Sequence, residues 1–147
     1  MPYFICPNCQ QRVIDKDRRD GLTHQPVGCI SCGFGFLFEL LEDYYPRPGS
    51  GMIVCDHFQR VIALGRGVFE LTGYREDNLL GKDLKDSLGL SGFEGQDPAT
   101  LTTEWGVRKL DQNLTVQMRS GTKRDVIADF FPAYDDDGGL LVVLAPG

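Results

Sequence analysis

The sequence predicts an α+β protein made of two modules, and three observations lead to this prediction. Two Cys-x-x-Cys pairs near the N-terminus have a spacing typical of a small metal-stabilised β module. Short apolar runs and glycine-terminated helical segments follow, and three strand-like segments end the chain. A breaker-rich segment separates the two parts. We therefore predict a module at 1–45, a linker at 46–51 and a larger domain at 52–147.

Composition and charge restrict the possible functions. The 147 residues are 41% hydrophobic and 24% charged, which is a globular composition. The net charge of −6 opposes binding to a phosphate backbone, so nucleic acid is not the expected partner. The sequence has neither an apolar run of the roughly 18 residues that a membrane span requires nor a signal-peptide pattern. We expect a cytoplasmic protein without a membrane segment.

Four cysteines predict a metal site in the N-terminal module. Cys6 and Cys9 form one pair and Cys29 and Cys32 form the other, so that two tight turns can present four thiolates to one tetrahedral Zn²⁺. The arrangement, with Gly33 after the second pair, resembles a zinc ribbon, which implies one structural zinc ion. Because so short a module buries little surface, metal binding would supply much of its folding free energy.

The same cysteines leave other chemistry open. Four thiolates also bind iron, and the protein would then be a redox or electron-transfer protein. Disulfides are disfavoured because we expect a reducing compartment. We interpret His24 as a loop residue, since four thiolates complete the metal site. The mixed-sign segment around Arg18 and Arg19 is interpreted as a solvated loop, and the alternative is a basic tip that binds nucleic acid or an acidic partner.

The aromatic stretch from Phe34 to Tyr45 combines two periodicities. Phe34, Phe36, Phe38 and Leu40 alternate as in a strand, whereas Leu37, Leu40, Leu41 and Tyr44 have the i, i+3, i+4, i+7 spacing of a helix. We expect a strand and then a change to helix near Leu40. Since so many apolar side chains need to be covered, we expect this stretch to pack against the second domain or another subunit.

The larger domain opens with a predicted hairpin and two short helices. The apolar runs Met52–Cys55 and Val61–Leu64 are joined by the polar turn Asp56–Arg60. The helix that follows packs through Val68, Leu71 and Phe69, and the Gly after Thr72 ends it by adopting a positive φ. A second helical turn, at 77–80, is closed by another glycine.

This stretch resembles the opening half of a PAS domain. The matching residues are Asp56, Arg60, Val61, Ile62, Leu71, Thr72, Gly73, Tyr74, Leu79, Leu80, Gly81 and Lys82. One departure is Gly65, which stands where the family usually has the Asn that caps the first helix. The resemblance implies a five-stranded antiparallel sheet with short helices across one face.

The remaining residues extend the resemblance to about 51–146. A third helix is predicted at Lys82–Leu88, and a fourth begins at Asp97-Pro98, with the Asp as its cap. The packed face of the fourth helix would contain Leu101 and Trp105, with Val107 or Leu110 extending it. Strands are predicted at 114–118, 126–134 and 140–145, joined by polar, glycine-containing turns.

The resemblance also implies a pocket for haem, flavin or a small metabolite, or an empty one. Flavin photochemistry of the LOV type is disfavoured because Cys55 is the last cysteine and lies in a predicted strand, where we interpret it as a buried hydrophobe. Haem is disfavoured because no histidine follows His57. Trp105, which could stack on a noncovalent flavin, and Met118, a soft contact, are the candidate pocket residues, although packing roles are favoured for both.

The expected function is sensory or regulatory and non-enzymatic. The sequence contains no kinase or cyclase motif and no Ser/His/Asp or Cys/His arrangement. The domain would sense a small molecule in its pocket, or bind a protein partner or a second copy of the chain. These contacts would use the ribbon, the aromatic stretch or the sheet face. The alternatives are the iron-containing redox protein and a transcription-associated ribbon that contacts nucleic acid or polymerase.

Overall fold

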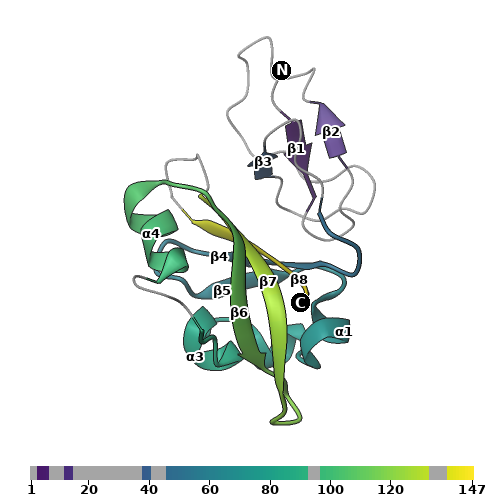
Figure 1. The fold of residues 1–147 in the computed structure, drawn as a ribbon. Helices are drawn as coiled ribbons and strands as arrows, with labels where there is room; N and C mark the ends of the chain where they lie inside the picture. Colours follow the sequence, from purple (N-terminus) through teal and green to yellow (C-terminus); the bar gives the residue numbers. More distant parts are fainter. Residues whose placement is uncertain (1–2, 7–11, 15–37, 41–45, 93–96, 133–138) are drawn as a thin grey trace.

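A computed structural model describes residues 3–6, 12–14, 38–40, 46–92, 97–132 and 139–147. These residues form two separate antiparallel sheets (Figure 1). The smaller sheet contains β1 (Tyr3–Ile5), β2 (Arg12–Ile14) and β3 (Phe38–Leu40), in the order β2-β1-β3. The strand predicted before Leu40 is therefore present as β3. The predicted change to helix near Leu40 concerns residues 41–45, which lie outside the described part of the chain.

The larger sheet has five strands. They are β4 (Gly51–Cys55), β5 (Val61–Leu64), β6 (Lys109–Gln117), β7 (Lys123–Pro132) and β8 (Leu140–Pro146). Their order is β5-β4-β8-β7-β6, and every neighbouring pair is antiparallel. The predicted five-stranded antiparallel sheet is confirmed, and its first and last strands, β4 and β8, lie next to each other in the sheet.

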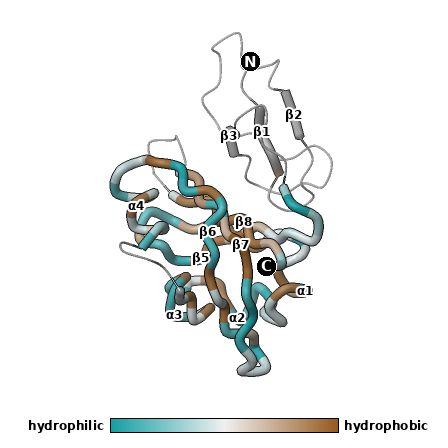
Figure 2. Tube along the Cα trace, in the orientation of Figure 1, coloured by the Kyte–Doolittle hydropathy of each residue, from teal (hydrophilic) through white to brown (hydrophobic). Residues whose placement is uncertain are grey.

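The apolar sequences of the two central strands, β4 and β8, match their burial on both faces of the sheet. β4 and β8 are covered on both faces and therefore read as nearly continuous apolar runs rather than alternating ones. The register pairs Ile53 with Val142 and Cys55 with Leu140. Hydrophobic residues follow β7 and β8 through the middle of the domain, whereas the β6–β7 turn is hydrophilic (Figure 2).

The described residues between β5 and β6 form four short helices. They are α1 (Val68–Thr72), α2 (Glu76–Leu79), α3 (Leu84–Leu88) and α4 (Pro98–Trp105). α1 ends at Gly73, whose φ is 79°, so the predicted glycine stop is confirmed. Asp97 caps α4 by accepting a hydrogen bond from the Ala99 backbone N–H at 3.0 Å, also as predicted. In Figure 1, α1 and α3 lie on the opposite side of the large sheet from β1–β3.

Two details of α1 differ from the prediction. Its N-cap is Gly67, with φ 98°, rather than Gly65, and no side chain caps it. Phe69 is 46% exposed, so the packed face consists of Val68 and Leu71 with the buried Thr72. In so short a helix only one narrow face contacts the sheet, and Phe69 lies outside it.

The packed face of α4 was also wrongly predicted. Its buried residues are Pro98, Ala99 and Thr102, whereas Trp105 is 73% exposed. The helix ends one residue before Gly106, and Leu110 belongs to β6, so Val107 and Leu110 are not helical. Small residues therefore form the buried face of α4, Leu101 is half-buried, and the Trp105 side chain is exposed.

The large sheet has a hydrophobic cluster on each face. On the helix-covered face the cluster includes Ile53, Val116, Phe130 and Val142. The opposite face carries the smaller cluster, which comprises Met52, Val54, Ala63, Phe131, Leu141 and Val143. All of these side chains are at most 8% exposed. The second face is therefore an interior surface of the whole chain rather than a free sheet face.

Candidate functional site

The interior between the helices and the large sheet is the first candidate site. Ala99 and Thr102, one helical turn apart, place one face of α4 against the sheet, where Ala128 and Phe130 of β7 are fully buried. The buried side chains on this face are mainly apolar, with Thr72 of α1 and Thr102 of α4 as buried polar residues among those described. Thr102 is fully buried, and its hydroxyl has no hydrogen-bond partner in the described part of the chain. An uncompensated buried hydroxyl is costly, and the described residues leave the hydrogen-bonding capacity of this one unused.

Gln59 brings a second polar group to α4 from the β4–β5 turn. Its side-chain N–H group donates to the hydroxyls of Thr100 at 3.2 Å and Thr103 at 3.4 Å. Its Oε1 is buried and finds no partner among the residues described. The backbone of Gln59 has φ 65°, and its carbonyl accepts from the Leu84 N–H. Sequence analysis did not single out Gln59, because a Gln in a polar turn carries no signal of long-range contact.

Neither candidate pocket residue lies inside this interior. The indole of Trp105 is on the surface at the end of α4. Met118 is partly exposed and follows the last residue of β6, where its N–H donates to the Thr122 carbonyl in the β6–β7 turn. The alternation of buried residues in β6 is present, since Leu114 and Val116 are buried. It does not extend to Met118, because the strand ends at Gln117.

Cys55 is a buried thiol in β4, as predicted. It is 2% exposed and belongs to the cluster beneath the helices. Burial, and to a smaller extent the nearby Asp56 and Asp83 carboxylates, raise the pKa of Cys55 well above its ordinary value. The thiol is therefore neutral and a poor nucleophile in the folded protein.

We predict that Cys55 reacts with iodoacetamide at pH 8 at least about 100-fold more slowly in native protein than in urea, because each unit of raised pKa removes tenfold of the reactive thiolate. Peptide mass spectrometry after pulse labelling measures this ratio. The Cys55 thiol ionises near its ordinary pKa only in the unfolded state. Its contribution to the free energy of unfolding is therefore complete below about pH 8.5 and declines as the pH rises above this value. Equal rates of Cys55 labelling in native protein and in urea would show that the thiol is accessible in the folded state and would contradict this prediction.

Only one of the four predicted zinc ligands is described. Cys6 directly follows β1 and is completely buried. Cys9, Cys29 and Cys32 lie outside the described residues, and no group of three or more potential metal ligands occurs among those that are described. A buried cysteine at the end of a strand in a three-stranded sheet suits a ligand position, and the four-thiolate site stays a prediction.

An ion-pair network lies on the second face of the large sheet. Asp129 of β7 is buried, and its Oδ2 accepts a hydrogen bond from the Arg47 guanidinium at 3.1 Å. Its Oδ1 accepts from the Asp111 backbone N–H at 2.8 Å. Arg47 also pairs with the Asp111 carboxylate. Because Arg47 precedes β4 by only a few residues, the segment that enters the sheet is tied to β7.

In the part of the chain that is described, no helix is long and apolar enough to cross a membrane.

Comparisons with known proteins identify the fold. No protein-family model and no curated protein sequence matches the chain. Among solved structures, it is similar to a PAS domain from Colwellia psychrerythraea, with a TM-score of 0.55 and 13% identity over 67% of this chain and 86% of that one. The PAS domain of nitrogen regulation protein NR(II) from Vibrio parahaemolyticus has a TM-score of 0.55 and 15% identity over 69% and 92%. The light-state dimer of the fungal blue-light photoreceptor Vivid has a TM-score of 0.56 and 11% identity over 71% and 82%.

The strand order, the short helices on one face and these similarities define the class of the larger domain. It has a PAS-like fold, as the sequence resemblance implied. Identities this low establish the fold and not the function.

Proposed function

We propose that this chain is a non-enzymatic sensory or regulatory protein, in which a PAS-like domain responds to a small molecule or a protein partner. The observation that carries the proposal is the Arg47–Asp129 ion pair within a PAS-like sheet. It joins the sheet to the segment leading from the N-terminal module. A change in the position of β7 would therefore alter the constraint on that segment, which is what a sensory domain requires of its output.

As the ligand of the sensory domain we propose a small, mainly apolar molecule bound in the interior. The helix-facing cluster supplies the apolar lining, and Thr102 and Gln59 supply two polar atoms that lack partners among the described residues. A ligand that bears one or two hydrogen-bonding groups would satisfy them. The lining offers no cysteine or histidine from the helices for LOV-type flavin or haem, since none occurs after His57 in the sequence.

We propose a structural zinc ion for the N-terminal module, held by Cys6, Cys9, Cys29 and Cys32. The burial of Cys6 and the spacing of the four cysteines support it. Binding of a partner protein or a second copy completes the proposed role. Such binding is supported by analogy with Vivid, which is described as a dimer in its light state. A cytoplasmic location is part of the same proposal.

Native mass spectrometry of freshly purified protein tests these proposals in one measurement. The expected spectrum shows one zinc ion per chain, a bound small molecule or a dimer, or both. Cys9→Ser and Cys29→Ser should lose the zinc, because three thiolates and a hydroxyl bind it far more weakly. The matched control is Cys55→Ser, which should keep it.

Different outcomes would overturn different parts. Full zinc occupancy in Cys9→Ser would refute the four-thiolate site, and iron in place of zinc would favour the redox alternative. A protein that stays monomeric, carries no ligand and shows no thermal shift with any compound of a metabolite library would contradict the sensory role of the domain.

A further inference from the structure

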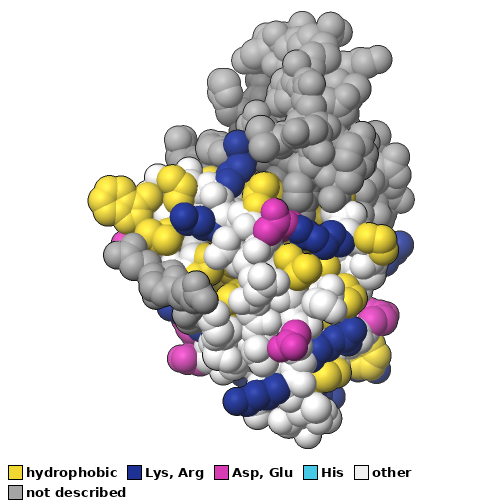
Figure 3. Space-filling view, viewed as in Figure 1, with side chains coloured by type: hydrophobic (Ala, Val, Ile, Leu, Met, Phe, Trp, Pro, Cys, Tyr) yellow, Lys and Arg dark blue, Asp and Glu magenta, His cyan; other side chains and the backbone are white. Residues whose placement is uncertain are grey.

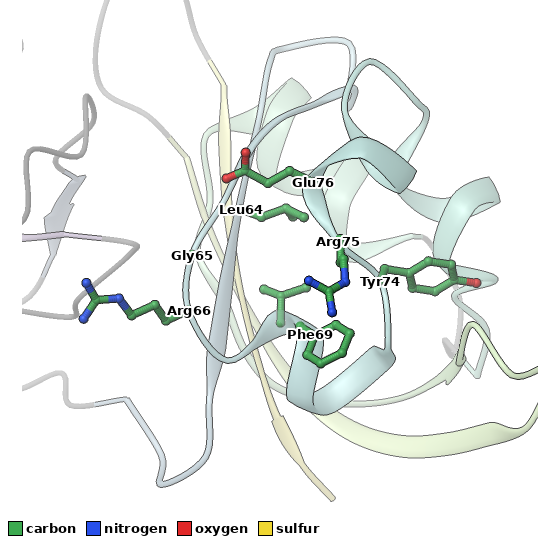
Figure 4. A pocket seen from close by; sticks show the side chains of 8 residues that line it. Leu64, Gly65, Arg66, Phe69, Tyr74, Arg75 and Glu76 are labelled. Carbon is green, nitrogen blue, oxygen red and sulfur yellow. The ribbon is translucent and has the colours of Figure 1, made fainter.

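A surface cleft separate from the interior lies where β5 passes into α1 and α2. Its volume is about 240 Å³, and it opens to solvent. Leu64 and Val68, which are 6% and 1% exposed, reach the cleft from the hydrophobic core and give it an apolar floor. Phe69, the side chain wrongly predicted to be packed, forms a wall (Figure 4). The cleft therefore offers contact area for one apolar group of side-chain size.

Arg75 supplies a cationic group directly above this apolar surface. Its guanidinium carbon lies 4.5 Å from the centre of the Phe69 ring, a cation–π arrangement that limits where the group can point. In Figure 4, Arg75 extends over Phe69 in the middle of the cleft, Arg66 extends away at one side, and the Glu76 carboxylate lies at the upper edge.

Among the described residues, the two arginines of the cleft form no ion pair, as is also true of exposed cations elsewhere in the domain such as Lys82 and Arg119. Arg47, Arg60 and Lys85 each pair with an aspartate. Within the described residues, Arg66 and Arg75 pair with no carboxylate. On a chain of net charge −6, acidic groups are abundant, yet none neutralises these guanidinium groups in the part of the chain that is described. The N–H donors of Arg75 are thus held in place by a ring and are free to bind an anion.

We propose that this cleft binds a carboxylate carried close to an aromatic or aliphatic group. The carboxylate would receive paired hydrogen bonds from Arg75, with Arg66 adding attraction from the rim. The apolar group would cover Leu64, Val68 and the Phe69 ring. Such chemistry occurs in free aryl or alkyl carboxylic acids and in acidic peptide segments of a partner protein. The proposal does not depend on the ligand of the interior or on the zinc site.

Amide NMR titration of the full ¹⁵N-labelled chain tests this inference with three probes: 3-phenylpropionate, the neutral 3-phenylpropanol, and the capped dipeptide acetyl-Phe-Glu-amide. The acid should shift the amide signals of Gly65, Arg66, Arg75 and Glu76 and bind with a millimolar dissociation constant. The alcohol should bind at least about tenfold more weakly, because it lacks the charge that Arg75 recognises. Tighter binding of the dipeptide than of the acid would identify a peptide as the source, and the reverse order a free acid.

Variants separate the cleft from general charge effects. Arg75→Gln should weaken binding of the acid about tenfold or more, and Arg75→Lys should recover only part of it, because a lysine cannot form the paired hydrogen bonds. Arg119→Gln removes an exposed arginine from the β6–β7 turn and should leave binding unchanged. Unaltered thermal unfolding of each variant shows that the fold is kept. Absence of shifts at these amides, equal binding of the alcohol, or undiminished binding to Arg75→Gln would each overturn the proposal.

Discussion

Replacing Gly51 by alanine is expected to lower the free energy of unfolding of the large domain by about 3 kcal/mol, the upper part of the usual range for overpacking. A Cβ on Gly51 would lie 2.5 Å from the Val68 backbone N and 2.7 Å from the Gly67 carbonyl carbon. These are backbone atoms, so no side-chain rotation relieves the overlap. The start of α1 would have to move away from β4. Urea unfolding followed by circular dichroism measures the loss.

Gly81→Ala is the matched control for this substitution. Gly81 has φ 79°, but none of the described atoms lies within 4 Å of the position that an alanine methyl group would take there, so only backbone strain of about 1 kcal/mol is expected. A larger loss in Gly51→Ala than in Gly81→Ala isolates the close approach of β4 and α1. If Gly51→Ala were as stable as Gly81→Ala, the backbone contact between Gly51 and Val68 would not exist in solution.

Replacing Arg47 by methionine is expected to destabilise the domain by about 2 kcal/mol. Asp129 is 1% exposed, and the substitution removes the cation that pairs with its buried charge. The effect falls short of the largest known for buried pairs because Arg47 itself is 35% exposed and the Asp111 N–H still donates to Asp129. Hydrogen exchange should also accelerate at the Ser50 amide, which donates to the Arg47 carbonyl.

A double-mutant cycle identifies the ion pair as the cause. In Arg47→Met/Asp129→Asn the buried charge is removed while an acceptor for the Asp111 N–H is retained, so most of the lost stability should return. Arg60→Met breaks the exposed pair with Asp56 and should change stability by no more than about 0.5 kcal/mol. Additive effects of Arg47→Met and Asp129→Asn would show that the two residues do not interact. The proposed link between the linker and β7 would then be wrong.

Local sequence signals predicted the elements of the larger domain well. The hairpin from Met52 to Leu64, the stop at Gly73 and the cap at Asp97 depend on backbone chemistry within a few residues, and each is present in the structure. The wrong assignments concern which face of an element is buried. Phe69 and Trp105 are large and apolar, but the short helices that carry them contact the sheet through smaller neighbours. Hydrophobicity alone does not choose a face in a helix of one or two turns.

The polar residues of the sites escaped sequence analysis for a related reason. Asp129 is a charged residue in a strand, which favours solvent exposure, yet it is buried and pairs with Arg47, a residue distant in sequence. Gln59 reaches α4 only because the hairpin folds against that helix. The proposed role of Arg75 in binding an anion depends on the Phe69 ring, which holds its guanidinium group in the cleft. On the face seen in Figure 3, hydrophobic and charged side chains are mixed, so residue type alone marks no binding surface there.

The sequence by itself determined the two-part pattern of the chain, the PAS-like succession of elements and the four cysteines that predict a zinc site. These follow from spacing and from local backbone preferences, which neighbouring residues are sufficient to specify. Only the tertiary structure decided three contacts. Arg47 pairs with Asp129, the Gln59 side chain donates to α4, and the Gly51 backbone lies against the start of α1. Each of these contacts joins segments distant in sequence, and its energy arises only when folding removes both partners from water.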